Sequence, residues 1–221
     1  MDEDTWLNTQ NLNELLTHPD IFDHRKRRLL LCACSRRLLN SLTDIRFKHA
    51  IDATEEYADQ RVTWEELKTN ARRAAIEARN ALTASRPGGR IHDAAVAVVA
   101  TTAKFMSWDV LTLARLALAN TQGRYEQEVE RTEEMAQVQL LRDIFGNPFR
   151  PVAFSSSWRT DTAVSLARDM YESRDFSAMP ILADALQDTG CDSDEILAHC
   201  RDPKQVHVRG CWVVDLVLGK E

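Results

Sequence analysis

The residues of this chain that are best suited to chemistry lie near its C-terminal end, between positions 191 and 211. Zinc in proteins is held by cysteine thiolates and histidine imidazoles arranged as a tetrahedron. Cys191, Cys200, His207 and Cys211 supply such a set, and we predict them as candidate zinc ligands. Their spacing is looser than that of paired zinc knuckles. Buried cysteines also serve as small apolar core residues, so a purely structural role for the same thiols stays open.

A cysteine nucleophile is the second chemistry that these residues allow. Cys200 or Cys211 would act as the thiolate, with His199 or His207 as its base. Neighbouring helix residues point about 100° apart, which weighs against His199 and Cys200 as a pair. His207 and Cys211 would share one face of a helix that began before them. Because no phosphate-binding glycine loop, Gly-x-Ser-x-Gly or His-Glu-x-x-His motif is present in the sequence, we expect a protein without enzymatic activity.

A run of basic residues is the main electrostatic feature of the sequence. The helix predicted over residues 24–37 carries six Lys and Arg residues, and it follows an acidic N-terminal segment. Such a surface can bind nucleic acid or an acidic protein partner, and its candidate partner-binding residues are Arg25, Arg28, Arg36 and Arg37. The alternative is that the basic residues pair with this acidic segment, internally or across a surface, or are simply solvated. The net charge of −6 argues against a role in coating nucleic acid, which needs a positive surface.

The overall composition indicates a helical protein. The 221 residues include only 7 Gly and 6 Pro, which is too few for the tight turns of a β-sandwich or barrel. The longest apolar run, around 94–103, is far shorter than the roughly 20 residues that span a bilayer, so we expect no membrane segment. The sequence begins without a signal-peptide pattern. We therefore expect a cytoplasmic protein whose five cysteines are reduced thiols or metal ligands.

Local signals mark the expected starts of helices. Asp23 suits the N-cap of one helix, and Thr43 or Asp44 suits the N-cap of the next. Thr63 and Glu66 have the spacing of a capping box, in which each side chain bonds to the backbone N–H of the other residue.

Two breaks divide the rest of the chain. Residues 86–90 (RPGGR) end one long helix, and a helix of small residues is predicted from 91 to about 120. Gly146 suits the left-handed position after a helix end, and Pro148 cannot continue that helix. An extended strap segment near 147–157 follows. Further helices are predicted near 160–174, 178–189, 193–199 and 208–218.

The predicted fold class is therefore all-α, an orthogonal multi-helix array with one extended strap segment near 147–157. We predict an N-terminal helical region over 1–145 and a C-terminal helical region over 146–221, packed as one globular unit. Short connections between several helices favour this array over a regular up-and-down bundle.

Three segments of the C-terminal third carry a resemblance to a known family. They are residues 140–152 (LLRDIFGNPFRPV), 180–188 (PILADALQD) and 207–221 (HVRGCWVVDLVLGKE). Together with residues 28–37 (RLLLCACSRR) and 56–59 (EYAD), they resemble a family of uncharacterised bacterial helical proteins whose members often end in the HVRGCW signature. The resemblance covers about half of the chain. It implies a bacterial origin and no particular activity.

These observations favour a non-enzymatic helical interaction or regulatory module of a bacterial intracellular system, with an unidentified protein partner. Two alternatives stay open. One is a zinc-binding protein that uses the C-terminal Cys/His cluster. The other is a nucleic-acid-binding protein that uses the basic helix 24–37.

Overall fold

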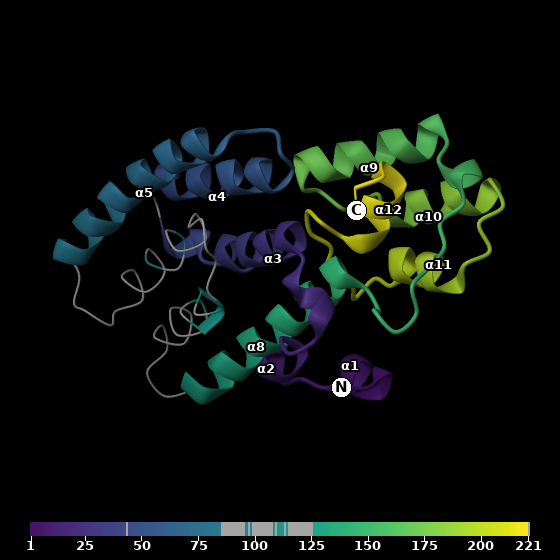
Figure 1. The fold of residues 1–221 in the computed structure, drawn as a ribbon, viewed down its shortest axis with the longest axis horizontal. Helices are drawn as coiled ribbons and strands as arrows, with labels where there is room; N and C mark the ends of the chain where they lie inside the picture. Colours follow the sequence, from purple (N-terminus) through teal and green to yellow (C-terminus); the bar gives the residue numbers. More distant parts are fainter. Residues whose placement is uncertain are drawn as a thin grey trace. The chain divides into compact units, whose positions relative to one another are not determined.

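The computed structural model describes residues 1–42, 44–84, 96, 98, 108, 110–112, 114 and 126–220. Every regular element in this part of the chain is a helix, and the helices pack against one another (Figure 1), which confirms the predicted all-α class. The break predicted at 86–90 and most of the helix predicted from 91 to 120 lie outside the described residues. Within the described ranges, no helix has both the length and the apolar character needed to cross a bilayer.

The chain divides into two compact units. The central unit is Gln10–Val138, and the terminal unit combines Met1–Thr9 with Gln139–Glu221. The sequence placed the division at 145/146. The structure places it inside a long helix and adds the first nine residues to the C-terminal part.

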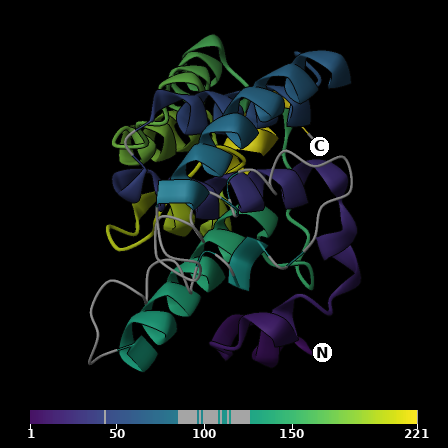
Figure 2. The same ribbon diagram turned by 90° about the vertical axis from the view of Figure 1, so that its left-hand side faces the viewer.

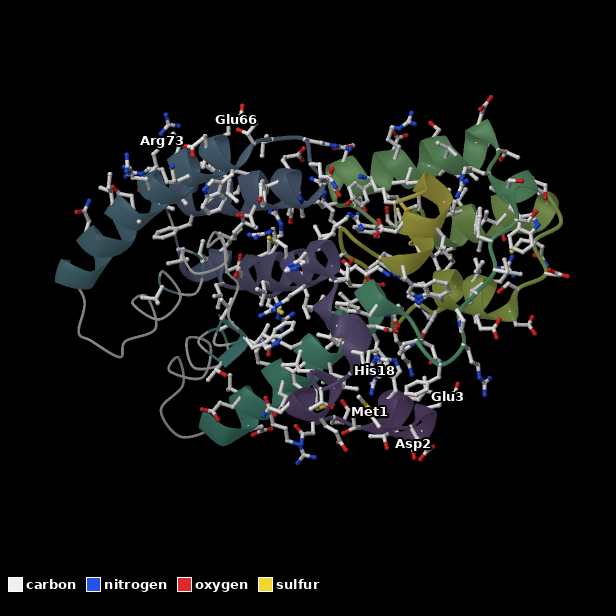
Figure 3. All side chains as sticks on the ribbon, in the orientation of Figure 1. Met1, Asp2, Glu3, His18, Glu66 and Arg73 are labelled. Carbon is white, nitrogen blue, oxygen red and sulfur yellow. The ribbon has the colours of Figure 1, made fainter. Side chains whose placement is uncertain are left out.

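The central unit is built around three consecutive helices. Its elements are α2 (Leu12–Leu15), η1 (Pro19–Phe22), α3 (His24–Arg36), η2 (Leu39–Ser41), α4 (Ile45–Ala58), α5 (Trp64–Ala84) and the first part of α8 (Glu126–Phe145). Figures 1 and 2 show α4 and α5 side by side, and α4 also packs on α3. Glu66 and Arg73 are exposed and point outward from α5 (Figure 3). The buried core includes Cys32, Leu38, Phe47, Ala50, Ile51 and Ala74.

The predicted caps of these helices are confirmed. The Asp23 carboxylate accepts a hydrogen bond from the backbone N–H of Lys26, which starts α3. Asp44 caps α4 in the same way, whereas Thr43 lies outside the described residues. Glu66 accepts from the Thr63 N–H at 2.7 Å, and the Thr63 hydroxyl accepts from the Glu66 N–H at 3.3 Å. Each cap satisfies backbone donors that the first helical turn leaves without a partner.

The terminal unit consists of short helices around one apolar core. Its elements are α1 (Glu3–Asn8), the last turns of α8, η3 (Ser156–Trp158), α9 (Asp161–Ser173), α10 (Met179–Asp188), α11 (Asp194–Arg201) and α12 (Trp212–Leu218). α9 packs on α10 and α12, and α11 packs on the same two helices (Figure 1). The core residues include Ala167, Met170, Tyr171, Leu182, Leu186, Ile196 and Val213.

The segment after α8 and the start of α12 refine two predictions. Residues 146–155 have no regular secondary structure, and η3 follows them. The last helix was predicted from position 208, but α12 begins at Trp212. Gly210 has a φ of +95°, which a right-handed helix does not accommodate, so His207 and Cys211 lie in a loop and not on one helix face.

Helix α1 belongs to the terminal unit because the end of α8 binds its backbone and its tryptophan. The buried Trp6 indole N–H donates to the Gly146 carbonyl at 3.0 Å. The Arg142 guanidinium donates to the backbone carbonyls of Trp6 and Thr9, with Nη2 to oxygen distances of 2.6 and 2.7 Å. Gly146 has a φ of +67°, the left-handed geometry predicted for the residue that ends this helix.

Candidate metal centre

Four side chains from three parts of the terminal unit converge on one buried place. Asp143 lies in the last turn of α8, His199 lies on α11, and His207 and Cys211 lie in the loop between α11 and α12. Each offers one donor atom, and the four donor atoms lie within 4.8 Å of one another. The residues are therefore a group that could hold a metal ion.

Four of the separations between donor atoms are close to those around a small tetrahedral ion. Asp143 Oδ1 lies 2.9 Å from His207 Nδ1 and 3.2 Å from His199 Nε2. Cys211 Sγ lies 3.2 Å from His199 Nε2 and 3.7 Å from His207 Nδ1. Zinc bonds of about 2.0–2.3 Å at tetrahedral angles give ligand separations of about 3.3–3.6 Å. Adjustments of a few tenths of an ångström in these four distances would match that geometry.

The group is largely shielded from solvent. Asp143 and Cys211 are fully buried, and the His199 and His207 side chains keep only 12% and 7% of their surface exposed. All four positions of a tetrahedron are supplied by the protein. Structural zinc sites have this closed character, whereas catalytic sites keep one position for water or substrate.

Asp143 has partners on both of its carboxylate oxygens. Its Oδ1 faces both histidines, and its Oδ2 accepts the backbone N–H of Val208 at 2.9 Å. Burial alone raises the pKa of this carboxyl, but the hydrogen bonds and charges of His199 and His207 outweigh that effect and hold the pKa below its usual value. Asp143 is therefore an anion that draws the α11–α12 loop to the end of α8.

Cys211 does not have the properties of a nucleophile. Burial raises the pKa of its thiol well above the ordinary value, and the negative charge of Asp143 raises it further. A nucleophilic cysteine needs a thiolate and access for a substrate, and a fully buried thiol offers neither. A bound cation would instead stabilise the thiolate as a ligand.

Trp212 fixes the proton of His199 when no ion is bound. Its indole N–H donates to His199 Nδ1 at 3.2 Å, and the two ring centroids lie 5.0 Å apart. Indole is a donor only, so Nδ1 is the acceptor and the ring proton lies on Nε2. That N–H points to Asp143 and Cys211. An ion at Nε2 would need the proton to move to Nδ1, which would break the bond from Trp212.

The structure brings together two of the four predicted zinc ligands. His207 and Cys211 belong to the group, and Asp143 and His199 complete it. Cys191 and Cys200 are buried in the apolar core of the terminal unit instead. Burial raises the pKa of the Cys200 thiol to about 12, as expected for a core residue.

The sequence around Asp143 contains a signal that rules based on the spacing of metal ligands do not use. It is a single acid among Leu140, Leu141, Ile144 and Phe145, all of which are buried. A carboxylate within such a run must find partners in the interior. The partner His207 lies 64 residues away in the sequence, so only the fold identifies it.

The basic residues predicted to bind a partner are engaged within the central unit. Arg36 binds Glu55 and Asp52, and Arg37 binds the buried Glu133 with an Nη2 to Oε2 distance of 2.7 Å. Arg25 binds Asp59 at 3.0 Å, and the buried Arg28 guanidinium lies 5.0 Å from the centre of the Tyr57 ring. Internal pairing with carboxylates thus occurs for Arg25, Arg36 and Arg37, with partners on α4, at Asp59 and on α8. The prediction that this helix binds a partner stays a prediction.

No family model, curated protein or solved structure matches the chain, so comparison with known proteins adds no functional assignment. The resemblance of residues 140–152, 180–188 and 207–221 to a bacterial family stays a prediction.

Proposed function

We propose that this protein binds one zinc ion through Asp143, His199, His207 and Cys211, and that the ion holds its terminal unit together. The observation that supports the proposal is the convergence of these four donor atoms, from α8, α11 and the following loop, within 4.8 Å in a buried place. Without an ion, every polar atom of this buried group would still need a hydrogen-bond partner.

The donor set favours zinc over other common cations. Calcium and magnesium prefer oxygen ligands, and here a thiol and two imidazoles outnumber the single carboxylate. Zinc accepts sulfur, nitrogen and oxygen donors together in a tetrahedron. The proposed role is structural, because the protein fills all four positions and the group is buried.

The ion would also explain how an irregular loop keeps a fixed place. Residues 202–211 have no regular secondary structure, yet they carry two of the four donors. Bonds from that loop to an ion shared with α8 and α11 would order it. The same proposal includes the wider role of a non-enzymatic helical interaction or regulatory module in the cytoplasm. A structural ion can stabilise a protein that binds a partner and catalyses no reaction.

Metal analysis of the purified protein tests the proposal. The protein is incubated with excess zinc, separated from free metal by gel filtration and analysed by elemental analysis. We expect about one equivalent of zinc per chain, as for a structural site. Cys211→Ser and His199→Gln should lose it, and Cys200→Ser should retain it, because Cys200 is an equally buried thiol outside the group.

Circular dichroism of each variant separates loss of the site from loss of the fold. A helical wild-type protein that retains less than about 0.1 equivalent would rule out a specific site, because buried zinc sites bind tightly. Retention of zinc by both Cys211→Ser and His199→Gln would place the ion elsewhere.

A further inference from the structure

The last turn of α8 connects the candidate metal centre to the N-terminal segment, residues 1–9. Arg142 and Asp143 are adjacent in this turn. Arg142 donates to the carbonyls of Trp6 and Thr9, and Asp143 faces the two histidines of the metal centre. One helical turn therefore serves two binding surfaces.

Gly146 provides a second connection between the same two surfaces. Its carbonyl accepts the Trp6 indole N–H at 3.0 Å. Its Cα lies directly against the Trp212 ring, so closely that an added Cβ would be 3.2 Å from Trp212 Cγ. Trp212 follows the ligand Cys211 and begins α12. The N-terminal segment thus contacts the turn that carries Asp143. It also contacts Gly146, which packs against Trp212 next to Cys211.

The N-terminal segment is held mainly by polar contacts beyond Trp6. Glu3, labelled at the start of α1 in Figure 3, accepts from Asn147 Nδ2 at 2.8 Å and pairs with Arg150 at 2.6 Å. α1 itself has only 6 residues. A helix this short is not stable alone in water, so its structure depends on docking to the end of α8.

We infer that docking of the N-terminal segment and binding of the metal ion are coupled, each strengthening the other through the last turn of α8. This inference rests on the proposed zinc site. A docked segment holds Arg142 and Gly146 and so restricts the turn that presents Asp143. Restricting a ligand in its bound position raises affinity because less order is lost on binding. By linkage, the bound ion tightens docking by the same factor.

The coupling makes the first nine residues a regulatory element for the metal centre. Anything that removes the segment from Gly146 and Arg142, such as proteolysis after Thr9 or capture of α1 by another protein, would weaken retention of the ion. The segment has the chemistry for such capture. It presents the exposed acids Asp2 and Asp4 on the same short segment as the exposed Leu7.

Zinc affinity of full-length variants tests the coupling. Trp6→Phe keeps an aromatic ring but removes the N–H that donates to the Gly146 carbonyl. Glu3→Ala removes the carboxylate that binds Asn147 and Arg150. Loss of a hydrogen bond of ordinary strength lowers an equilibrium constant by about three- to tenfold. We expect zinc binding, measured by competition with a chromophoric chelator, to weaken by about that factor in Trp6→Phe and by less in Glu3→Ala. Leu7→Ala is the matched control, because Leu7 is an exposed residue of the same helix.

Hydrogen exchange gives the reciprocal measurement. The Trp6 and Thr9 amides, which donate to the Asp2 and Thr5 carbonyls, should exchange more slowly in the zinc-loaded protein than in the zinc-free protein. Unchanged zinc affinity in Trp6→Phe, with the wild-type protein binding zinc normally, would overturn the coupling and leave the proposed function intact. A wild-type protein that binds no zinc would overturn both. Equal weakening in Leu7→Ala would also overturn the coupling, since it would show a general effect of the helix.

Discussion

Replacing Asp143 by asparagine is the most informative single change in the terminal unit. The side chain keeps its size, so the apolar core around it is preserved, but the negative charge and one acceptor oxygen are lost. In the wild-type protein three donors face the carboxylate: His207 Nδ1 at 2.9 Å, His199 Nε2 at 3.2 Å and the Val208 N–H at 2.9 Å.

The expected loss of stability follows from these contacts. The one amide oxygen of asparagine can retain the bond from Val208, and its NH2 group then faces the two histidines. Two hydrogen bonds to a charged acceptor are lost, at about 1.5–3 kcal/mol each. Removing a buried charge returns part of this, because its desolvation was unfavourable. We therefore expect Asp143→Asn to lower the free energy of unfolding by about 2–4 kcal/mol in the absence of metal.

Urea denaturation in the presence of a chelator measures this change, and the same variant should also lose zinc. Asp169→Asn is the matched control, because Asp169 is an exposed acid on α9 of the same unit. It should change the free energy of unfolding by no more than about 0.5 kcal/mol. If Asp143→Asn behaved like Asp169→Asn, the carboxylate would not bind the two histidines as described. If it lost stability but bound zinc as tightly as the wild type, Asp143 would not be a ligand.

Three further outcomes are expected. The pKa of Asp143 lies below the ordinary 3.8, so the contribution of its carboxylate to folding stability should be complete above that pH and lost as the pH falls through the folded-state pKa. Acid unfolding of the metal-free proteins measures this contribution, and Asp143→Asn should show a smaller pH dependence than the wild type. Gly146→Ala should lower the melting temperature more than Gly190→Ala, because both glycines have positive φ but an added Cβ meets Trp212 only at Gly146; equal shifts would refute the contact. Trp212→Phe should bind zinc as tightly as the wild type or several-fold more tightly in chelator competition, since it removes a donor that competes for His199 Nδ1; tenfold weaker binding would contradict the proton assignment.

The helices could be predicted largely because their signals are local. Asp23, Asp44 and the Thr63 and Glu66 pair act within one turn of the residues that they cap, so sequence spacing contains the information. The beginning of α12 was not predicted correctly. The pattern of apolar residues extends back to Val208, but a left-handed Gly210 interrupts it, and whether a glycine adopts that conformation depends on the surrounding fold.

The candidate metal centre could be predicted only in part, because its four side chains come from distant segments of the chain. His207 and Cys211 were found since they lie close in sequence in a cysteine- and histidine-rich region. His199 was not among the predicted zinc ligands and was considered only as a base for a cysteine nucleophile, where its place next to Cys200 on a helix weighed against it. The divergence of adjacent side chains that weakened that pair is what the structure uses, with His199 facing Cys211 and Cys200 packing in the core. Cys191 and Cys200 show that residue type alone does not separate a ligand from a core thiol.

The size of its elements explains why the terminal unit would benefit from an ion. α10, α11 and α12 contain 10, 8 and 7 residues, each below the roughly 12–15 residues at which an isolated helix becomes even marginally stable. Packing must therefore supply most of their stability, and residues 202–211 between α11 and α12 add little apolar burial of their own. In such a unit the free energy of metal binding is also free energy of folding, because the site does not exist in the unfolded chain. Asp143 lies on the longer α8, so an ion would tie α11, the start of α12 and the loop between them to the end of that helix. The same geometry would give the N-terminal segment the influence proposed for it, since this segment contacts α8 at the turn that carries Asp143.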